Sequence, residues 1–212
     1  MKVSEIFRSI QGEGYWSGRS AVFVRFSGCN LECPWCDTDH SDGLEMDMDE
    51  IAELARHRAH HHDNMVVLTG GEPTLQAHSD LLSRLFRRFR LICLETNGTN
   101  VPPMFYDAKH DTDYQMGQLW VTVSPKSPTT WRELPGLGYA DEIKVVVPGG
   151  GWSRAQLAEL ADVFKEPPTR HLYLQPEDGL EREDAKRWAI GAVMNDPRWR
   201  ISLQIHKLLG LS

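Results

Sequence analysis

The sequence predicts an α/β protein built as a partial (β/α) barrel, with mostly parallel strands and the functional site at the strand carboxyl ends. Three observations support this fold class. Apolar strand-like runs alternate with amphipathic helical patterns, which is typical of parallel sheets. The 212 residues are fewer than the roughly 250 that a closed eight-unit barrel needs. Polar segments also follow several of the strands. Because no repeat or linker divides the chain, we expect a single domain covering residues 1–212.

The expected strands are short runs rich in β-branched and aromatic residues. In the last of them Ser202, Gln204 and His206 would share one face, because side chains alternate along a strand. The common alignment of the strand ends favours a ligand-facing role for that polar face. The expected strands cover residues 21–26, 65–69, 91–96, 119–124, 142–147, 171–175 and 200–206.

Four helices are expected between the strands. Asp47 followed by Glu50 has the pattern of a capping box, and Ser153 is the expected N-cap of a later helix. The polar stretch 102–118 is expected to be irregular and to replace a helix. The apolar stripes of the four helices run through residues 51–55, 81–89, 157–164 and 185–192, the last helix covering 182–194.

Composition narrows the class of protein. The formal net charge of -7 argues against a broad phosphate-binding surface, so no nucleic-acid partner is expected. The chain has no run of eighteen apolar residues and no secretory pattern at its start, so neither a membrane span nor secretion is expected. Three of the four cysteines are clustered, which favours a metal or cluster site in a reducing cytoplasm over disulfides. The fourth, Cys93, is expected to be a small buried apolar residue.

The clustered cysteines are Cys29, Cys33 and Cys36, spaced C-x3-C-x2-C on one short loop. An electron-transfer [4Fe–4S] cluster is normally held by four cysteines. Three thiolates would hold three irons of a cube and leave the fourth iron open to a substrate or cosubstrate. The spacing therefore predicts a reaction centre at this loop.

Several further polar segments follow strands, and in α/β proteins sites are built at that edge of the sheet. Arg25, in an otherwise apolar strand, could bind a ligand carboxylate or equally pair with a protein carboxylate. Lys144 is ambiguous and is left outside the expected site. The histidines 57, 60, 61 and 62 are expected to be a solvated helix end. The strand-end segments are 29–36, 69–73, 95–99, 124–126, 175–179, and Gln204 with His206.

These motifs resemble known enzymes. The three cysteines with Trp35 look like the radical S-adenosylmethionine signature, and Thr69-Gly70-Gly71-Glu72-Pro73 resembles the segment of that superfamily near the methionine amine. More specifically, the chain resembles the 7-carboxy-7-deazaguanine synthase family of deazapurine biosynthesis. The segments that carry this resemblance are 5–7, 11–14, 25–31, 36–38, 95–98, 123–126, 175–176, 178–179, and Gln204 with His206-Lys207.

The resemblance implies a modified partial barrel with a [4Fe–4S] cluster on Cys29, Cys33 and Cys36. S-adenosylmethionine would chelate the open iron, and the hydroxyl of Thr38 would bind Mg²⁺, which prefers oxygen ligands. The cosubstrate contacts that the resemblance implies are Trp35, Cys36, Asp37, Gly71, Ser124, Pro125, Lys126, Gln175, Pro176, Glu177 and Asp178.

The implied reaction is the ring contraction of 6-carboxy-5,6,7,8-tetrahydropterin to 7-carboxy-7-deazaguanine. A 5′-deoxyadenosyl radical would abstract hydrogen from the pterin, and ammonia would leave. Arg25 and the cation would meet the substrate carboxylate. The implied partners are a flavodoxin- or ferredoxin-type reductant and a second copy of the chain in a homodimer. The implied substrate contacts are Ile10, Gln11, Gly12, Glu13, Arg25, Thr69, His206 and the carboxylate of Ser212.

Two alternatives remain open from the sequence. Another radical S-adenosylmethionine enzyme, such as a glycyl-radical activase, would need a groove for a peptide rather than a small enclosed site. A non-enzymatic zinc module would join the three cysteines to His40, because zinc accepts three cysteines and one histidine. The zinc alternative leaves the strand-end segments unexplained.

Overall fold

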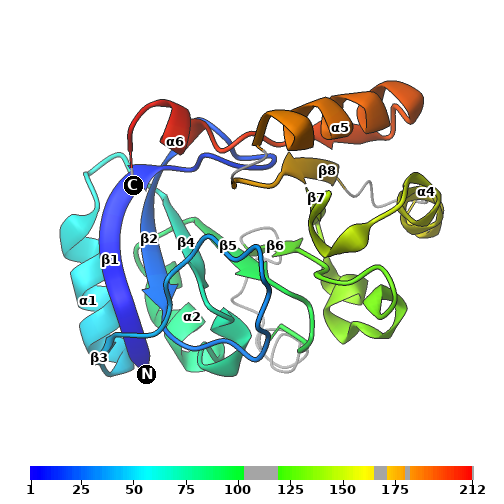
Figure 1. The fold of residues 1–212 in the computed structure, drawn as a ribbon. Helices are drawn as coiled ribbons and strands as arrows, with labels where there is room; N and C mark the ends of the chain where they lie inside the picture. The colour runs from blue at the N-terminus through cyan, green and yellow to red at the C-terminus, as the bar shows by residue number, and fades with distance from the viewer. Residues whose placement is uncertain (103–118, 165–170, 180–181, 212) are drawn as a thin grey trace.

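A curved open sheet forms the centre of the molecule (Figure 1). The computed structural model describes residues 1–102, 119–164, 171–179 and 182–211. Within these residues the sheet has nine strands in the order β3-β1-β2-β4-β5-β6-β7-β8-β9. From β2 to β9 each strand is parallel to its neighbours in this order, whereas β1 is antiparallel to both of its neighbours, β2 and β3. The strands are β1 (Lys2–Ile10), β2 (Ser20–Phe26), β3 (Leu44–Glu45), β4 (Met65–Gly70), β5 (Leu91–Thr96), β6 (Leu119–Val123), β7 (Glu142–Val147), β8 (His171–Pro176) and β9 (Trp199–Ile201).

Two helices begin where the sequence predicts their N-caps. The side chain of Asp47 accepts hydrogen bonds from the backbone of Asp49 and Glu50, completing the expected capping box. Ser153 caps its helix in the same way with Gln156. The helices are α1 (Met48–Arg58), α2 (Ser79–Phe86), α4 (Arg154–Val163), α5 (Arg182–Asn195) and α6 (Ile205–Leu208), with 3₁₀ turns at Pro73–Leu75, Trp131–Glu133, Pro135–Tyr139 and Gly149–Gly151.

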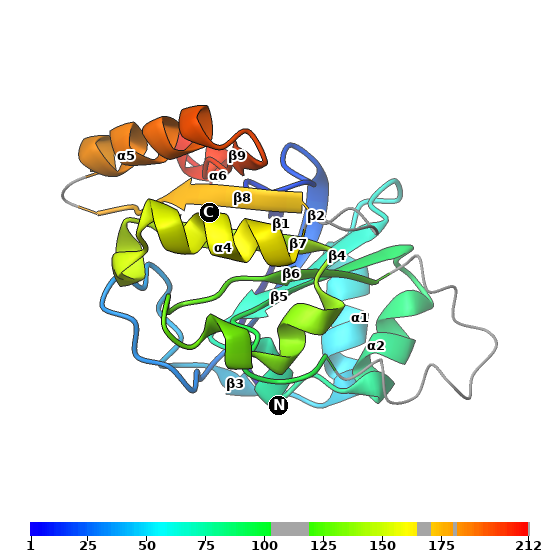
Figure 2. The ribbon, with the colours of Figure 1, turned by 90° about the vertical axis from the view of Figure 1, so that its right-hand side faces the viewer.

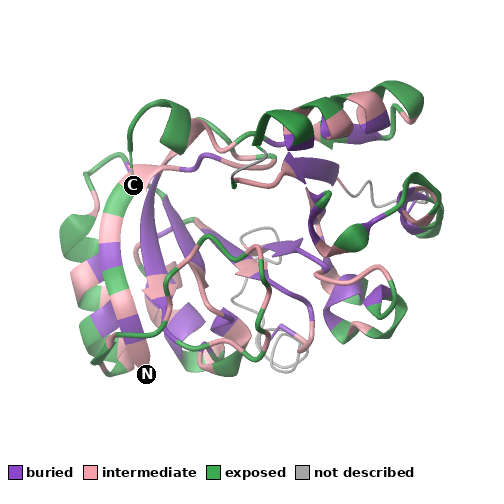
Figure 3. Cartoon of the chain, viewed as in Figure 1, coloured by how far each residue is buried: buried purple, intermediate pink, exposed green. Residues whose placement is uncertain are grey.

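The outer face of the sheet is covered by helices over two apolar clusters (Figures 1 and 2). One cluster joins β2, β4 and β5 to α1 and α2, and it includes the fully buried Leu68 and Leu94. The other joins β7 and β8 to α4 and α5, and it includes the buried Ile143 and Val145. Leu119 of β6 packs against both clusters. Figure 3 shows these strands as buried ribbons with exposed helix surfaces around them.

The inner face of the same strands is arranged in layers. Towards the amino ends of β2, β4 and β5 it is apolar, with Phe23, Val67 and Cys93 in a third cluster. One step along the strands, the residues that follow on this face are polar or charged. Because side chains alternate along a strand, these inner residues come from positions between those of the outer clusters. The members of the polar layer are Arg25, Thr69, Glu95, Thr122, Lys144 and Gln175.

The structure differs from the sequence expectations in two places. Strands β1 and β3 were not expected. The prediction of one strand over 200–206 is wrong beyond Ile201, because the chain turns there and forms α6 from Ile205. Ser202, Gln204 and His206 therefore do not form one face of a strand. The irregular segment expected at 102–118 lies outside the described residues except for Pro102.

The junction of β6 and β7 is the shortest pairing between parallel strands in the described sheet. These strands pair only at Thr122–Glu142 and Val123–Ile143, whereas β7 and β8 pair along their whole length. The histidines at the end of α1, positions 57 and 60–62, are exposed as expected. No helix in the described ranges is long and apolar enough to cross a membrane.

Candidate active site

A cavity of about 370 Å³ opens at the carboxyl ends of the parallel strands. Its floor is formed by Phe7 and Phe23, its walls by the polar layer of the inner face, and its mouth by the cysteine loop. Residues from both ends of the chain, from Phe7 to Leu211, line it. The expected site residues that line the cavity are Ile10, Gln11, Glu13, Arg25, Cys29, Cys33, Trp35, Cys36, Asp37, Thr38, Thr69, Gly71, Ser124, Lys126, Gln175 and His206.

The cysteine loop follows β2 directly. Cys29, Cys33 and Cys36 all line the cavity and none forms a disulfide. A turn is closed by the hydrogen bond from the backbone N–H of Cys36 to the carbonyl of Cys33, at 3.0 Å. Asn30 fixes the loop further, since its amide bonds to Asn97 at 2.9 Å and Thr99 at 2.8 Å. The three thiols are therefore held on one side of a small cavity.

The loop after β4 supports the cysteine loop through its backbone. A side chain at Gly71 would bring its Cβ within 1.9 Å of the carbonyl oxygen of Gly28, so only glycine fits there. The adjacent Glu72 is fully buried. Its carboxylate accepts hydrogen bonds from Thr74, from Thr96 at 2.7 Å and from the backbone of Asn97 at 2.7 Å. Glu72 is thus a structural tie between the ends of β4 and β5.

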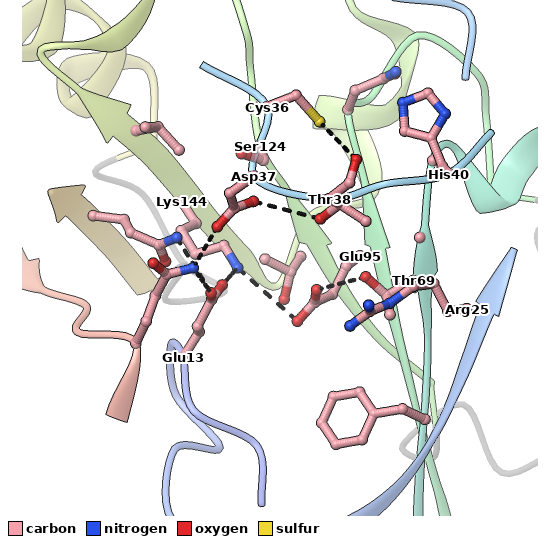
Figure 4. A pocket seen from close by; sticks show the side chains of 18 of the residues that line it. Glu13, Arg25, Cys36, Asp37, Thr38, His40, Thr69, Glu95, Ser124 and Lys144 are labelled. Carbon is pink, nitrogen blue, oxygen red and sulfur yellow. Dashed lines mark hydrogen bonds and ion pairs between the residues drawn. The ribbon is translucent and has the colours of Figure 1, made fainter. Parts of the chain in front are cut away.

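The polar layer contains a buried charge network that the sequence interpretation missed (Figure 4). Lys144, which the sequence interpretation left outside the site, is buried in the cavity wall, where its ammonium bonds to Glu13. It also lies 3.9 Å from a carboxylate oxygen of Glu95. Glu95 in turn accepts hydrogen bonds from Gln11 at 2.9 Å and Thr69 at 3.0 Å. The alternation of Lys144 with Ile143 and Val145 was the signal that it faces inward.

The pKa values of this network are set by burial and by its opposite charges. Burial acts to raise the pKa of Glu13, but the charge of Lys144 and hydrogen bonds from Lys144 and Gln204 lower it below the ordinary value. For Lys144, burial acts to lower the pKa, and the charges of Glu13 and Glu95 raise it above the ordinary value. Glu13 and Lys144 are therefore both charged at neutral pH.

Arg25 is half-buried at the cavity wall rather than fully buried. Its guanidinium pairs with Glu5 of β1 at 2.7 Å and stacks over the ring of Phe7. The Nε atom of Arg25 is buried without a hydrogen-bond partner among the described residues. The structure thus contains the protein-carboxylate pair that was one of the two alternatives, while the guanidinium still lines the cavity.

The segment after β9 closes over the cavity. Gln204 bonds to Glu13 at 2.8 Å and to Asp37 at 3.0 Å. Lys207 bonds to Asp37 at 2.6 Å and to Asp178 at 2.7 Å. Burial acts to raise the pKa of Asp37, but these hydrogen bonds and the charge of Lys207 lower it to about 2. The cysteine loop, the loop after β8 and α6 are therefore linked by ion pairs.

The remaining expected residues lie around the cavity rather than in its lining. Gly12 is buried beneath His206, where a Cβ would come within 1.8 Å of the imidazole. Pro125 is buried. Glu177 lies beside Gly149 near Trp35. Pro176 and Asp178 line a second pocket between α5 and α6, and Ser212 lies outside the described residues.

The donor set fits an iron–sulfur cluster better than a single metal ion. No three histidine, cysteine, aspartate or glutamate side chains in the described ranges converge on a point that could hold one metal ion. The zinc site with His40 is therefore not assembled. A cube binds each thiolate through a different iron, so three free cysteines on one side of a cavity suit it without converging.

Comparison with known proteins places this arrangement in a family. Residues 23–130 match the model of the radical SAM superfamily. The chain is 39% identical over 211 residues to the 7-carboxy-7-deazaguanine synthase of Bacteroides thetaiotaomicron, covering 99% of this chain and 98% of the relative. It is 35% identical over 235 residues to that of Nitratidesulfovibrio vulgaris, with the same coverage.

A solved structure agrees with these sequence matches. The crystal structure of QueE from Escherichia coli superposes with a TM-score of 0.72 at 28% identity, covering 95% of this chain and 92% of that one. Family membership implies a [4Fe–4S] cluster and S-adenosylmethionine, and the cysteine loop fits both. The chain belongs to the 7-carboxy-7-deazaguanine synthase family of the radical SAM superfamily.

Proposed function

We propose that this chain converts 6-carboxy-5,6,7,8-tetrahydropterin to 7-carboxy-7-deazaguanine, with ring contraction and release of ammonia. The observation that carries this proposal is one cavity that joins three free cysteines at its mouth to a layer of carboxylates, amides and a guanidinium below. Such a layer suits a small, flat, polar molecule with a carboxylate. Its similarity to named synthases over nearly the full chain supports the same reaction.

The cysteine loop and the loops beside it are the proposed cosubstrate site. Cys29, Cys33 and Cys36 would hold the cluster, and backbone and side-chain groups around it would orient the cosubstrate. Once bound, the cluster and S-adenosylmethionine supply the carbon radical that removes hydrogen from the substrate. The proposed orienting residues are Trp35, Asp37, Gly71, Ser124, Pro125, Lys126, Gln175, Pro176, Glu177 and Asp178.

The polar layer is the proposed substrate site. A pterin edge presents adjacent N–H donors and a carbonyl acceptor, which glutamine and carboxylate side chains can pair. The guanidinium of Arg25 lines the cavity and is suited to the substrate carboxylate. The proposed contacts are Ile10, Gln11, Gly12, Glu13, Arg25, Thr69, His206 and the carboxylate of Ser212.

Magnesium is part of the proposal. The hydroxyl of Thr38 lines the cavity and lies close to the carboxylate of Asp37, so a hard oxygen ligand is available beside the cysteines. A bound Mg²⁺ would draw the substrate carboxylate towards this side of the cavity. Substitution of Thr38 with valine, which removes the hydroxyl, should lower the Mg²⁺ dependence of turnover without loss of the cluster.

The proposed working form is a homodimer of single-domain chains, each covering residues 1–212. Support for one domain comes from the cavity, which uses residues from Phe7 to Leu211. A flavodoxin- or ferredoxin-type protein is the proposed electron donor. The free cysteines suit a reducing compartment, so we place the enzyme in the cytoplasm.

The test is an anaerobic assay of cluster-reconstituted protein with the pterin, S-adenosylmethionine, Mg²⁺ and a reductant. We expect 7-carboxy-7-deazaguanine and ammonia as products, identified by mass spectrometry. A protein with an intact cluster that leaves this pterin unchanged while it turns over another substrate would contradict the assignment. A Cys33→Ala variant, which lacks one cluster ligand, is the negative control.

A further inference from the structure

Lys144 occupies a position in the cavity wall that is unusual for a lysine. It lies in the middle of β7 and is 6% exposed. Its ammonium bonds to Glu13, which belongs to the segment after β1, and lies 3.9 Å from Glu95 at the end of β5 (Figure 4). One buried cation thus connects two carboxylates that come from distant segments of the chain.

Without that cation the two carboxylates would face each other in a half-buried space. Like charges held close together away from water raise the pKa of one partner, which then keeps a proton. The charge of Lys144 prevents this, because it balances one of the two negative charges. The network therefore places two carboxyl groups around a single ammonium at the cavity wall.

The two carboxylates differ in how many acceptor positions are occupied. Glu13 accepts three hydrogen bonds, one from Lys144 at one oxygen and two at the other, from Gln204 at 2.8 Å and Gln175 at 3.3 Å. In the described part of the chain each oxygen of Glu95 accepts one hydrogen bond, from Gln11 and from Thr69. A carboxylate oxygen can accept two. Glu95 thus keeps acceptor capacity directed at the cavity that it lines.

The chemistry of a pterin makes the charge state of this wall important. Its 2-amino group and ring N–H are neighbouring hydrogen-bond donors, so the groups that face them must be hydrogen-bond acceptors. A protonated carboxyl presents a donor in their place, so the contact is lost or becomes repulsive. A proton retained on the wall therefore weakens substrate binding, because it leaves fewer acceptor positions for the donor edge.

We propose that Lys144 is a positioning residue for the ring-contraction reaction: its charge keeps Glu13 ionised, and its contacts fix Glu13 and Glu95 as the acceptor wall for the donor edge of the pterin. This inference rests on the proposed function. Lys144 acts through the two glutamates and does not itself touch the reacting atoms. A lysine with only a structural role would affect folding but would leave the pH dependence of substrate binding unchanged.

The test measures the dissociation constant of 6-carboxytetrahydropterin for cluster-loaded protein with S-adenosylmethionine and Mg²⁺ but no reductant, so that no turnover occurs. The measurement is repeated from about pH 6.5 to about pH 9, a range in which an unpaired buried carboxylate can titrate. Lys144→Met is the main variant, Lys144→Arg keeps the charge, and Lys186→Met on the surface of α5 is the matched control.

For Lys144→Met we expect at least about tenfold weaker pterin binding near neutral pH, because one partner of a buried charge pair is lost. Affinity should recover in part as pH rises, since the retained proton then leaves the glutamate pair. Binding of S-adenosylmethionine should stay within about twofold of the wild type. Lys144→Arg should restore most of the affinity and the wild-type pH profile, and Lys186→Met should match the wild type.

Other titratable or charged groups near the pair also affect the pH profile. They are Arg25 of β2, Asp37 of the cysteine loop, Cys93 of β5, Lys126 after β6, Glu142 of β7 and His206 of α6. The double variant Glu13→Gln with Lys144→Met separates their effects, because it keeps them all and removes one carboxylate of the pair. We expect it to bind weakly with a flat profile, and to fold even if Lys144→Met does not.

The outcomes separate this inference from the proposed function. Pterin binding by Lys144→Met that equals the wild type at every pH would overturn the inference and leave the proposed function standing. A pH-dependent loss that persists in the double variant would also overturn it. Wild-type protein with a full cluster that fails to bind the pterin would instead overturn the proposed substrate, and the inference with it.

Discussion

The two faces of the sheet are built from adjacent residues and follow different rules. On the outer face, Leu94 and Ile143 are fully buried in apolar clusters beneath helices. On the inner face, the next residue along each strand is Glu95 or Lys144, and both line the cavity. The outer face stabilises the fold through buried apolar area. The inner face places buried charges at some cost in stability, as binding sites often do.

The largest loss of activity should follow substitution of a cysteine at the mouth of the cavity. Cys36→Ala removes one of three cluster ligands, so turnover should fall to background and bound iron and sulfide should be lost. The thermal midpoint of the cluster-free protein should change little, because this residue is exposed and contributes nothing to the apolar clusters. The matched control is Cys93→Ala, which removes a buried thiol and should keep the cluster. Loss of the cluster in both variants would contradict the assignment of cluster binding to the loop cysteines alone.

Neighbouring residues on β5 offer the sharpest test of the difference between the faces. Leu94→Ala should lower the free energy of unfolding by about 2–5 kcal/mol, as for other buried leucines. Glu95→Gln should change it by less than about 1 kcal/mol but weaken pterin binding roughly tenfold. Urea unfolding and equilibrium binding measure the two effects. A Glu95→Gln variant that unfolds as readily as Leu94→Ala would show that the inner face is also structural.

Glu142 tests the cost of a buried charge on the inner face. Burial raises its pKa from 4.5 to about 7, opposed by the charge of Lys144 and a hydrogen bond from the backbone of Tyr15. Between these values the folded protein holds a proton that the unfolded chain has released, so the free energy of unfolding falls as pH rises. This amounts to about 3 kcal/mol by pH 8.

The variant Glu142→Gln cannot ionise, so it should gain most of that free energy at high pH and little below pH 4.5, the ordinary value for glutamate. Urea unfolding of the cluster-free protein across this range gives the measurement. Glu133→Gln, on an exposed turn, is the control and should show no such pH dependence. An equal gain at all pH values would point to packing rather than charge.

Arg25 should show a smaller and more selective effect. Arg25→Ala should weaken pterin binding by about 2 kcal/mol, the cost of a lost charged hydrogen bond, and spare S-adenosylmethionine. Glu5→Gln removes the ion-pair partner of Arg25 in the protein but leaves the guanidinium in the cavity. If Arg25 served only that ion pair, both variants would leave pterin affinity unchanged. Equal loss of both ligands in Arg25→Ala would contradict the carboxylate role.

The sequence predicted the outer face well because its signals are local. Apolar alternation located the parallel strands, and the capping boxes at Asp47 and Ser153 set the starts of two helices. Strand β1 was missed because only Val3 and Ile6 are buried along it, which breaks the period of two. The end of β9 was misplaced because alternating polar and apolar residues continue past Ile201 into a turn and α6.

The inner face was only partly predictable. Motifs located the cysteines and the residues after the strands, since their spacing along the chain is short. The role of Lys144 depends on Glu13, which is 131 residues away, and on Glu95 across the sheet. The sequence pattern showed that Lys144 alternates with apolar residues, but it did not show that its ammonium would pair with a carboxylate. Partners that are distant in sequence come together only through the strand order.

The short pairing of β6 with β7 means that a ligand in the cavity would stabilise the sheet as well as take part in the chemistry. Two ladder positions join the half of the sheet that carries α1 and α2 to the half that carries α4 and α5. Thr122 on one side of this seam and Lys144 on the other both line the cavity. A bound molecule that contacts both strands would therefore restrain the motion of one half of the sheet relative to the other. Amide hydrogen exchange in β6 and β7 should slow more on ligand binding than exchange in β4, which pairs fully with β2.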